Sequence, residues 1–125
     1  MTLVLDSGAL VAFERGDRVV AARIEAARRR RDRLVTSSGC IAQVWRGGPR
    51  QSLLARLLRG VHEHALHPKV SRAVGALCAK AGLADVVDAH VALLATHGDT
   101  VLTSDPVDLQ ALLRTAGVRA DLLAC

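Results

Sequence analysis

Aromatic residues are nearly absent from this chain of 125 residues, which has one Trp, one Phe and no Tyr. Proteins that bind RNA by base stacking present exposed aromatic rings to the bases. The shortage of such rings therefore argues against a base-stacking RNA platform. Half of the residues are nevertheless apolar, so the core must be built from Ala, Val and Leu. The length is typical of one domain, and we expect a single domain over residues 1–125.

Cysteines are few and widely separated, and Cys40, Cys78 and Cys125 form no CxxC pair. An odd number of distant cysteines does not suit a disulfide framework, so a reduced, cytoplasmic protein is expected. Cys40 and Cys78 fall in apolar, helix-like segments and are expected to be small core residues. No charged leader with an apolar core opens the sequence, and no apolar run approaches the roughly 18 residues of a membrane helix. Neither secretion nor membrane insertion is expected.

Several common functional signatures are also missing. The sequence has no P-loop, no dinucleotide-binding glycine pattern and no Gly-x-Ser-x-Gly elbow of a serine hydrolase. His62, His64 and His67 have no fourth ligand at a spacing that completes a tetrahedral zinc site. A receiver-like domain would need a phosphate-contacting lysine after a strand, whereas Lys69 and Lys80 fall in a predicted helix. These classes of function are therefore disfavoured.

Positive charge, by contrast, is plentiful and unevenly distributed. The net charge is +5, and residues 1–60 hold twelve arginines against five acids, while residues 61–125 hold five basic residues against seven acids. Because arginine suits bidentate contacts with phosphate, the N-terminal half is expected to contact a polyanion. The arginine run at residues 28–31 is interpreted as a solvated helix end, with RNA or an acidic partner as the alternative.

Strand and helix signals alternate along the chain. Apolar runs predict buried strands, and periodic segments that open with Ser, Asp or Pro predict helices, with Ser7 as a candidate cap of the first. The predicted strands cover residues 2–5, 34–36, 61–66, 100–103 and 119–122, and the predicted helices cover residues 7–14, 17–31, 37–45, 50–59, 68–80, 85–96 and 106–115. Strands separated by helices imply parallel crossovers, with helices on both faces of the sheet.

Three aspartates accompany the apolar runs. Asp6 ends the run over residues 3–5, Asp105 follows the run over residues 101–104, and Asp88 lies within an apolar helical segment. If the two runs are neighbouring parallel strands, Asp6 and Asp105 emerge side by side at the carboxyl ends, where open α/β sheets bind ligands. A carboxylate in an apolar helix, such as Asp88, is costly to bury without a cation or a donor. Three converging carboxylates would repel one another unless Mg²⁺ or Mn²⁺ neutralised them.

The segments LVLDSGAL, DVVDAHVALLA and VLTSDPVDL resemble three landmark blocks of PIN-domain ribonucleases, and most nearly those of VapC-type toxins of bacterial toxin–antitoxin modules. The resemblance extends over essentially the whole chain. It implies an α/β fold, a three-layer α/β/α sandwich with a central, mostly parallel sheet, and an acidic pocket for Mg²⁺ or Mn²⁺. It also implies an endoribonuclease that cuts structured RNA such as tRNA or rRNA, a VapB-type antitoxin that blocks the pocket, and a homodimer.

The family's functional residues map onto single positions of this sequence. Asp6, Asp88 and Asp105 match the acids that hold metal and support catalysis, and Ser7 matches the hydroxyl residue after the first acid. The family's remaining acid, a Glu on the helix after the second strand, is replaced by Gln43. Glutamine offers a neutral oxygen but supplies no charge and cannot act as a base. This departure leaves a second function open, a weakened PIN module that binds RNA or antitoxin without efficient cleavage.

Two further acids lie one helical turn from the predicted ligands. Asp85 precedes Asp88 by three residues and shares its helix face, so it either restores the charge missing at Gln43 or, more simply, caps the helix. Asp108 is interpreted as a solvent-facing or helix-capping residue. Apolar residues around Trp45 and over residues 53–58 repeat at helical spacing, and they either form a dimer surface or pack inside the monomer.

Overall fold

A five-stranded, wholly parallel sheet forms the centre of the molecule. The computed structural model describes residues 1–125. The strands are β1 (Thr2–Leu5), β2 (Arg33–Ser37), β3 (His62–His64), β4 (Thr100–Thr103) and β5 (Asp121–Ala124). Their order across the sheet is β3-β2-β1-β4-β5, and each neighbouring pair is parallel. Helices connect all five strands, because parallel neighbours need long crossovers.

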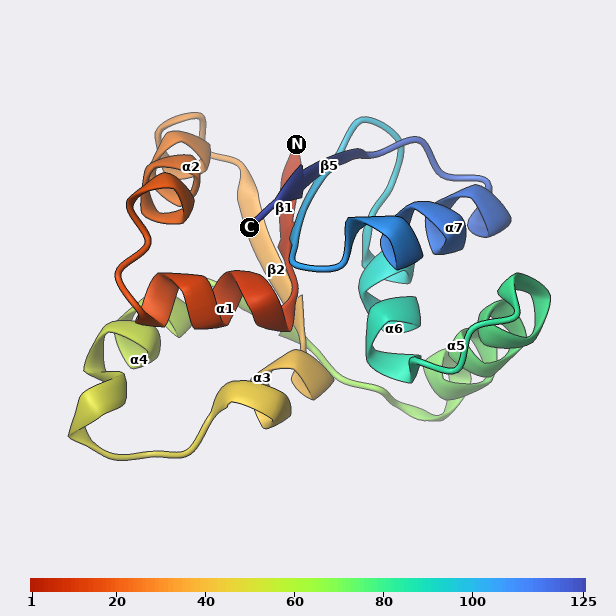
Figure 1. Cartoon of the computed structure of the whole chain (residues 1–125), viewed down its shortest axis with the longest axis horizontal. Coiled ribbons are helices and arrows are strands. Elements are labelled where there is room, and N and C mark those ends of the chain that lie inside the picture. Colours follow the sequence, from red (N-terminus) through yellow and green to blue (C-terminus); the bar gives the residue numbers. More distant parts are fainter.

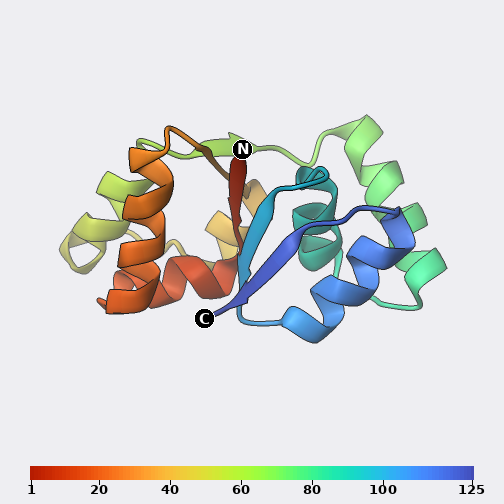
Figure 2. The ribbon, with the colours of Figure 1, turned by 90° about the horizontal axis from the view of Figure 1, so that it is seen from above.

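Helices cover both faces of this sheet. They are α1 (Ser7–Glu14), α2 (Arg18–Arg29), α3 (Ser38–Val44), α4 (Ser52–Leu58), α5 (Pro68–Ala81), α6 (Val86–Leu94) and α7 (Pro106–Ala116), with a 3-10 turn η1 (Pro49–Gln51) before α4. Figure 1 shows α1, α2 and α4 on one side of the sheet and α5, α6 and α7 on the other, and Figure 2 shows the same division from above. The predicted three-layer sandwich is therefore confirmed. None of these helices has the length and hydrophobicity of a membrane-spanning segment.

The core is aliphatic, as the shortage of aromatic residues predicted. A cluster of 25 buried apolar residues fills it, and none of them is aromatic. Val4 and Leu5 of β1 are fully buried, because helices cover this central strand from both sides. Phe13 only packs against the edge of the cluster, and Trp45 keeps 43% of its surface exposed. Cys40 belongs to the core, as predicted, whereas Cys78 was predicted there and is only half-buried against its edge. Cys125 is exposed, and all three are free thiols.

Short polar residues and prolines define where the helices begin. Asp17 caps α2 by accepting a backbone amide, as predicted. Pro68 and Pro106 occupy the first turns of α5 and α7, where a missing amide proton costs no hydrogen bond. The first helix differs from the prediction, since Asp6 and not Ser7 is its N-cap. The extended backbone at Asp6 turns its carboxylate back onto the first turn of α1.

Three predicted elements differ from the observed ones in ways that have a structural reason, and the other bounds agree to within two residues. The strand predicted at 61–66 is only the short β3, an edge strand with one neighbour whose first two residues are exposed. The helix predicted at 50–59 opens as a 3-10 turn at Pro49 before α4 begins. The last strand begins at Asp121 rather than Arg119, because α7 ends in a left-handed turn at Gly117 (φ 73°) and residues 118–120 lead back to the sheet.

The leucines of α4 are divided between core and surface. Leu54 and Leu57 belong to the buried cluster, so they pack inside the monomer, which is one of the two alternatives that the sequence left open. Leu53 is 49% exposed and Trp45, just after α3, is 43% exposed. Only Leu53 and Trp45 therefore remain as large apolar side chains available to a partner at this surface.

Candidate metal centre

The two aspartates predicted after strands stand at the same edge of the sheet. β1 and β4 are direct neighbours, with Leu5 opposite Leu102, and Asp6 and Asp105 follow these strands. The amide of Asp6 donates to the carbonyl of Leu102 at 3.1 Å, which extends the ladder beyond β1. From β1 the chain first continues to β2, on one side of β1, and it later returns to β4, on the other side of β1. This edge is therefore the topological switch point, where open α/β sheets bind ligands.

Asp6 is the buried carboxylate at this edge of the sheet. It is 2% exposed, and its two oxygens accept the amides of Ala9 at 2.8 Å and Ser104 at 3.1 Å. Burial raises the pKa of Asp6, and hydrogen bonds from Thr103 and from these amides oppose the rise. Asp6 thus caps α1 and ties it to the loop that carries Asp105. Each carboxylate oxygen has a second lone pair, so Asp6 can still accept a further contact.

Three other carboxylates converge directly. One oxygen each of Asp88, Asp105 and Asp108 lies within 4.8 Å of the others. Asp88 comes from the first turn of α6, Asp105 from the N-terminus of α7 and Asp108 from its first turn. Oxygen ligands lie about 2.0–2.6 Å from Mg²⁺ or Ca²⁺, so ligands on opposite sides of one ion are about 4–5 Å apart. The spacing and the all-oxygen donor set therefore fit one hard divalent cation.

Asp88 has the most perturbed acidity in this group. Its pKa is raised to about 7, first by burial, then by its contact with Asp105, and further by the charges of Asp85, Asp105 and Asp6. Like charges disfavour ionisation, so the carboxylates oppose one another in the absence of a cation. Asp6 acts on Asp88 through its charge, although its own oxygens lie outside the group of three. The structure thus brings Asp88 and Asp105 together and places Asp6 beside them.

Asp85 caps α6, which is the simpler of the two interpretations that the sequence left open. One of its oxygens accepts the amides of Val87 and Asp88, each at 3.0 Å. Its charge nevertheless contributes to the raised pKa values of Asp88 and Asp108. Asp85 therefore adds negative potential to the centre, while one of its oxygens is committed to the helix.

Asp108 is the member of the group that the sequence interpretation placed elsewhere. It is partly exposed, and its pKa is raised chiefly by the charge of Asp105. Asp108 follows Asp105 by three residues, the same spacing that relates Asp85 to Asp88. Helical periodicity was therefore the signal available in the sequence. A lone aspartate near a helix start is more often a cap than a ligand, so the spacing alone does not identify Asp108 as part of the group.

An open groove of about 560 Å³ is lined by Ser7 and Ser104, the sequence neighbours of Asp6 and Asp105, although none of the acids lines it. Ser7 at the start of α1, Arg15 just beyond its end, Gln43 of α3 and Ser104 all line it. Gln43 is exposed and faces this groove, whereas the three converging carboxylates come from α6 and α7. The groove therefore connects the neighbourhood of Asp6 to a positively charged side chain.

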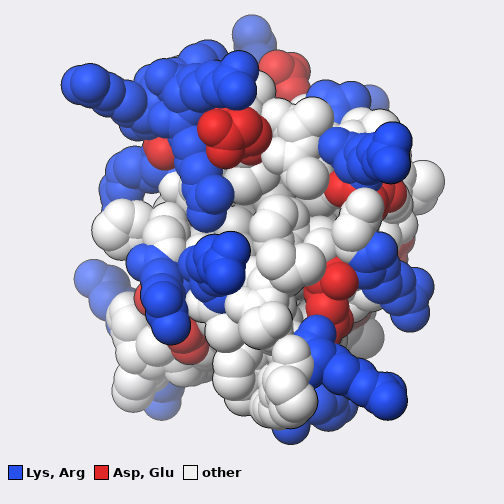
Figure 3. Space-filling view, turned by 90° about the vertical axis from the view of Figure 1, so that its left-hand side faces the viewer, with Lys and Arg blue, Asp and Glu red and all other residues white.

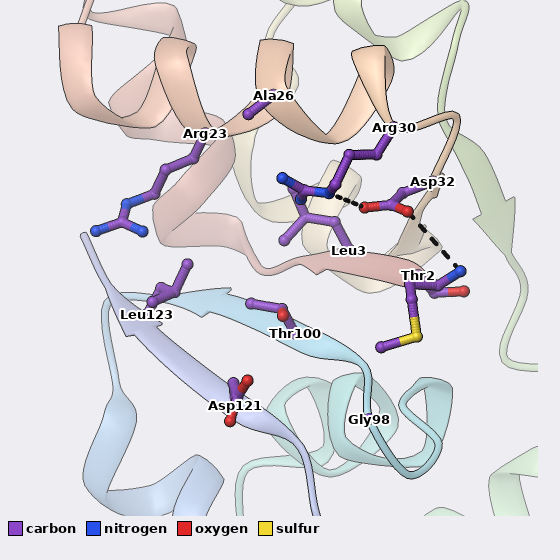
Figure 4. Close-up of a pocket in the computed structure, with 11 residues that line it drawn as sticks. Thr2, Leu3, Arg23, Ala26, Arg30, Asp32, Gly98, Thr100, Asp121 and Leu123 are labelled. Atoms are coloured by element: carbon purple, nitrogen blue, oxygen red, sulfur yellow. Dashed lines mark hydrogen bonds and ion pairs between the residues drawn. The ribbon is translucent and has the colours of Figure 1, made fainter.

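The arginine-rich surface lies mostly away from the acids. Residues 28–31 are exposed at the end of α2, which leads into the amino end of β2. Figure 3 shows basic side chains gathered on the α1, α2 and α4 side of the molecule. A pocket of about 360 Å³ lies at the same amino edge of the sheet, lined by Arg23, Arg30 and Asp32 among others (Figure 4). Arg30 pairs with Asp32 there at 3.0 Å, so part of the run serves local charge balance.

Comparison with known proteins reveals a shared fold. The sequence matches no family model and no curated protein. Solved structures with the same fold include a chain in the crystal structure of VapBC2 from Rickettsia felis, bound to a DNA fragment from their promoter. The TM-score is 0.72 and the sequence identity 15%, and the match covers 98% of this chain and 99% of that chain. At this identity the similarity shows the fold alone, and it confirms the PIN-like architecture that the three sequence blocks implied.

Proposed function

We propose that the protein is a metal-dependent endoribonuclease, the toxin component of a VapBC-type toxin–antitoxin module. The observation that supports this most strongly is the convergence of Asp88, Asp105 and Asp108 beside the buried Asp6, at the switch point of a PIN-like sheet. Carboxylates crowded in this way serve cation binding better than they serve stability. The basic N-terminal half and the three sequence blocks support a polyanionic substrate, structured RNA such as tRNA or rRNA.

Each acid has a distinct part in this proposal. Bound Mg²⁺ or Mn²⁺ would supply activation of water and charge stabilisation at the scissile phosphodiester. Asp88, Asp105 and Asp108 would each hold the ion through one oxygen. Asp6 adds negative charge beside the three ligands. By accepting the Ser104 amide, it also holds the loop between β4 and α7, which carries Asp105, in place. The Ser7 hydroxyl, beside Asp6 at the edge of the groove, would orient the attacking water or a phosphate oxygen.

Two basic regions are available to grip RNA. Arg15 lies just beyond the far end of α1 from Asp6 and lines the groove that Ser7 and Ser104 also line, so it would contact a phosphate of RNA bound along that groove. The arginines at 28–31 lie at the opposite edge, separated from the acids by the length of the strands, about 15 Å. An RNA that contacts both regions must therefore be folded, or long enough to span the molecule.

The direct test is cleavage of total tRNA and rRNA by purified, antitoxin-free protein. Discrete fragments are expected with Mn²⁺ or Mg²⁺, and excess EDTA should suppress them, because the acids alone cannot activate water for this attack. Cleavage at full rate in EDTA would contradict the metal-dependent mechanism. Tight RNA binding without cleavage, in protein that binds Mn²⁺, would favour a second function.

That second function is RNA or antitoxin binding without efficient cleavage, and Gln43 is the observation in its favour. We expect Asp108→Asn to weaken Mn²⁺ binding about tenfold by removing one liganding charge. Gln43→Glu should strengthen Mn²⁺ binding and cleavage by at most about tenfold, because it adds a negative charge that attracts the cation but is partly screened by solvent at this exposed position. Isothermal titration with Mn²⁺ and cleavage assays measure both effects.

Asp85→Asn is the matched control for these changes. Asparagine caps helices nearly as well as aspartate, so this variant should keep Mn²⁺ affinity within about threefold of the natural protein. A loss as large as that of an Asp88 variant would instead make Asp85 a ligand. If cleavage is undetectable until Gln43→Glu is introduced, the protein is the weakened module.

Metal binding should release a proton near neutral pH. The pKa of Asp88 is about 7 in the metal-free protein, above the ordinary value of 3.8. Below that pKa the carboxyl must lose its proton before it binds a cation, so apparent Mn²⁺ affinity should fall by up to about tenfold for each pH unit. Titration calorimetry in two buffers of different ionisation enthalpy counts the released protons. An affinity that is constant from about pH 5.5 to 8 would contradict this linkage.

Stability should have a matching pH dependence. Between pH 3.8 and about 7 the folded, metal-free protein holds the Asp88 proton more tightly than the unfolded chain does. The contribution of Asp88 to folding stability therefore declines as the pH rises through this window. Saturating Mn²⁺ should offset the decline, because the cation neutralises the carboxylate. Urea unfolding with and without Mn²⁺ at several pH values measures the effect.

We further propose a VapB-type antitoxin as partner, and a homodimer to which Trp45 and Leu53 contribute. A short antitoxin-like reading frame immediately upstream would support the first proposal. For the homodimer, Trp45→Arg/Leu53→Arg should convert a dimer into a monomer in sedimentation experiments, because both side chains are partly exposed in the single chain and would be covered by the partner. Val107→Arg is the control, since Val107 is 77% exposed on α7, away from Trp45 and Leu53, and its replacement should leave the sedimentation of a dimer unchanged. A natural protein that sediments as a folded monomer at micromolar concentration would reject the dimer.

A further inference from the structure

The junction between β2 and α3 contacts α6 on both sides of Asp88. Ser37, the last residue of β2, is hydrogen-bonded through Oγ to Nδ1 of His90 at 2.7 Å. Gly39, in the first turn of α3, lies against Val87, since a Cβ built on it would be 3.0 Å from Cγ2 of Val87. Val87 and His90 flank Asp88 in the sequence of α6. The turn that carries Asp88 is therefore held at two points by the same junction.

The Ser37–His90 hydrogen bond is buried. Ser37 is 1% exposed and His90 is 2% exposed. Ser37 Oγ also accepts the amide of Gly39 at 3.0 Å, so its hydroxyl proton is free to donate to Nδ1. When the hydroxyl donates, Nδ1 is the acceptor and the ring proton lies on Nε2; in the other tautomer Nδ1 donates to Oγ and the same contact is kept. A buried ring nitrogen without a partner is unfavourable, so the bond restrains the orientation of His90 against β2.

We propose that Ser37 and His90 are positioning residues of the metal centre, whose hydrogen bond sets the rotation of α6 that presents Asp88 to Asp105 and Asp108. This rests on the function proposed above. Residues two apart on a helix point about 200° apart, so His90 faces β2 while Asp88 faces the acids. Asp105 and Asp108 belong to α7, and only the relative orientation of the two helices keeps the three carboxylates together.

The two ring nitrogens of His90 have different surroundings, so substitutions that keep a polar atom at only one of the two positions can test the role of the bond to Ser37. Nδ1 meets Ser37, while the ring also lines a pocket of about 280 Å³ together with His64 and His67. In His90→Asn the side-chain amide stands near the place of Nδ1 and can accept from Ser37. In His90→Gln the amide stands near the place of Nε2, and Ser37 loses its partner. The two substitutions are similar in polarity, so they form a matched pair.

The experiment is Mn²⁺ titration of the full chain at one pH, with urea unfolding to verify that each variant is folded. His90→Gln and Ser37→Ala should each weaken Mn²⁺ binding about tenfold, as loss of an outer-shell contact does at metal sites, whereas His90→Asn should stay within about threefold. Ser37→Ala/His90→Gln should be no weaker than either single variant, because both remove the same bond. Equal affinities of the Asn and Gln variants, or additive losses in the double variant, would overturn the proposal.

Failure of the metal-centre proposal itself would look different. In that case the natural protein binds no Mn²⁺, and the positioning claim is decided by amide hydrogen exchange in the first turn of α6. Exchange there should be faster in His90→Gln than in His90→Asn, since only the former frees α6 from β2. Equal exchange rates in the two variants would refute the positioning role.

Discussion

Asp88→Asn should reduce metal-dependent RNA cleavage by about 10²- to 10⁴-fold, a loss of several kcal/mol of charge stabilisation at the scissile phosphate. The substitution removes a liganding charge and turns an acceptor into a donor that faces the cation. It should also make the metal-free protein more stable above about pH 7, because it removes a buried charge and its repulsion by neighbouring acids, which together raise the pKa of Asp88 to about 7. Cleavage kinetics and urea unfolding near pH 8 measure the two opposite effects.

Asp6→Asn provides an informative contrast. Cleavage should again be lost, but stability should fall, because the two oxygens of Asp6 accept the amides of Ala9 and Ser104 and asparagine keeps only one acceptor. Asp121→Asn is the neutral control, since Asp121 is exposed on β5 at the opposite edge of the sheet. Full cleavage in Asp88→Asn or in Asp6→Asn would refute the proposed mechanism.

Gly8→Ala should destabilise the protein by about 1–3 kcal/mol or more and disturb the acidic centre as well. A Cβ built on Gly8 would overlap the Cβ and Oγ of Ser104, whose amide binds Asp6. Relief of this overlap requires α1 and the loop before α7 to separate, and that movement would carry Asp105 away from Asp88. Urea unfolding and Mn²⁺ titration should both report a loss.

A compensating variant and a control test this packing argument. Gly8→Ala/Ser104→Gly should recover much of the stability, because it removes the two nearest of the three atoms that the new Cβ would meet and leaves only the amide nitrogen of residue 104. Gly75→Ala is the control, since nothing lies within 4 Å of a Cβ at this position inside α5. It should stabilise the protein by about 0.5–1 kcal/mol through helix propensity. If Gly8→Ala is as stable as the natural chain, the close approach of α1 to Ser104 is not required.

Most of the architecture was predictable from local features of the sequence. Apolar runs and helical periodicity predicted the order of strands and helices, and Asp17, Pro68 and Pro106 indicated where helices begin. The near absence of aromatic residues predicted an aliphatic core. The positions of Asp6 and Asp105 after apolar runs predicted an acidic edge of the sheet. Each of these features depends on a few neighbouring residues, which is why sequence patterns reveal them.

The boundaries that differed depend on longer-range pairing. The edge strand β3 is short because it has one neighbour, and β5 begins where the register with β4 allows it to pair. Asp6 rather than Ser7 caps α1, because its extended backbone lets one oxygen accept the amide of Ala9, while the position of β4 brings the amide of Ser104 to its other oxygen. Strand order and register are therefore needed to place these features.

The sequence by itself determined the PIN-like order of strands and helices and the all-aliphatic interior. It also placed Asp6 and Asp105 after apolar runs and Asp88 within an apolar helix. Only the tertiary structure decided that Asp108 joins Asp88 and Asp105 and that the arginine run at 28–31 lies at the opposite edge from them. The physical reason is that these relations depend on the order of strands and on the rotation of α6 and α7 about their axes. Helical periodicity reveals which residues share one helix face, but the direction of that face is set by packing against other elements.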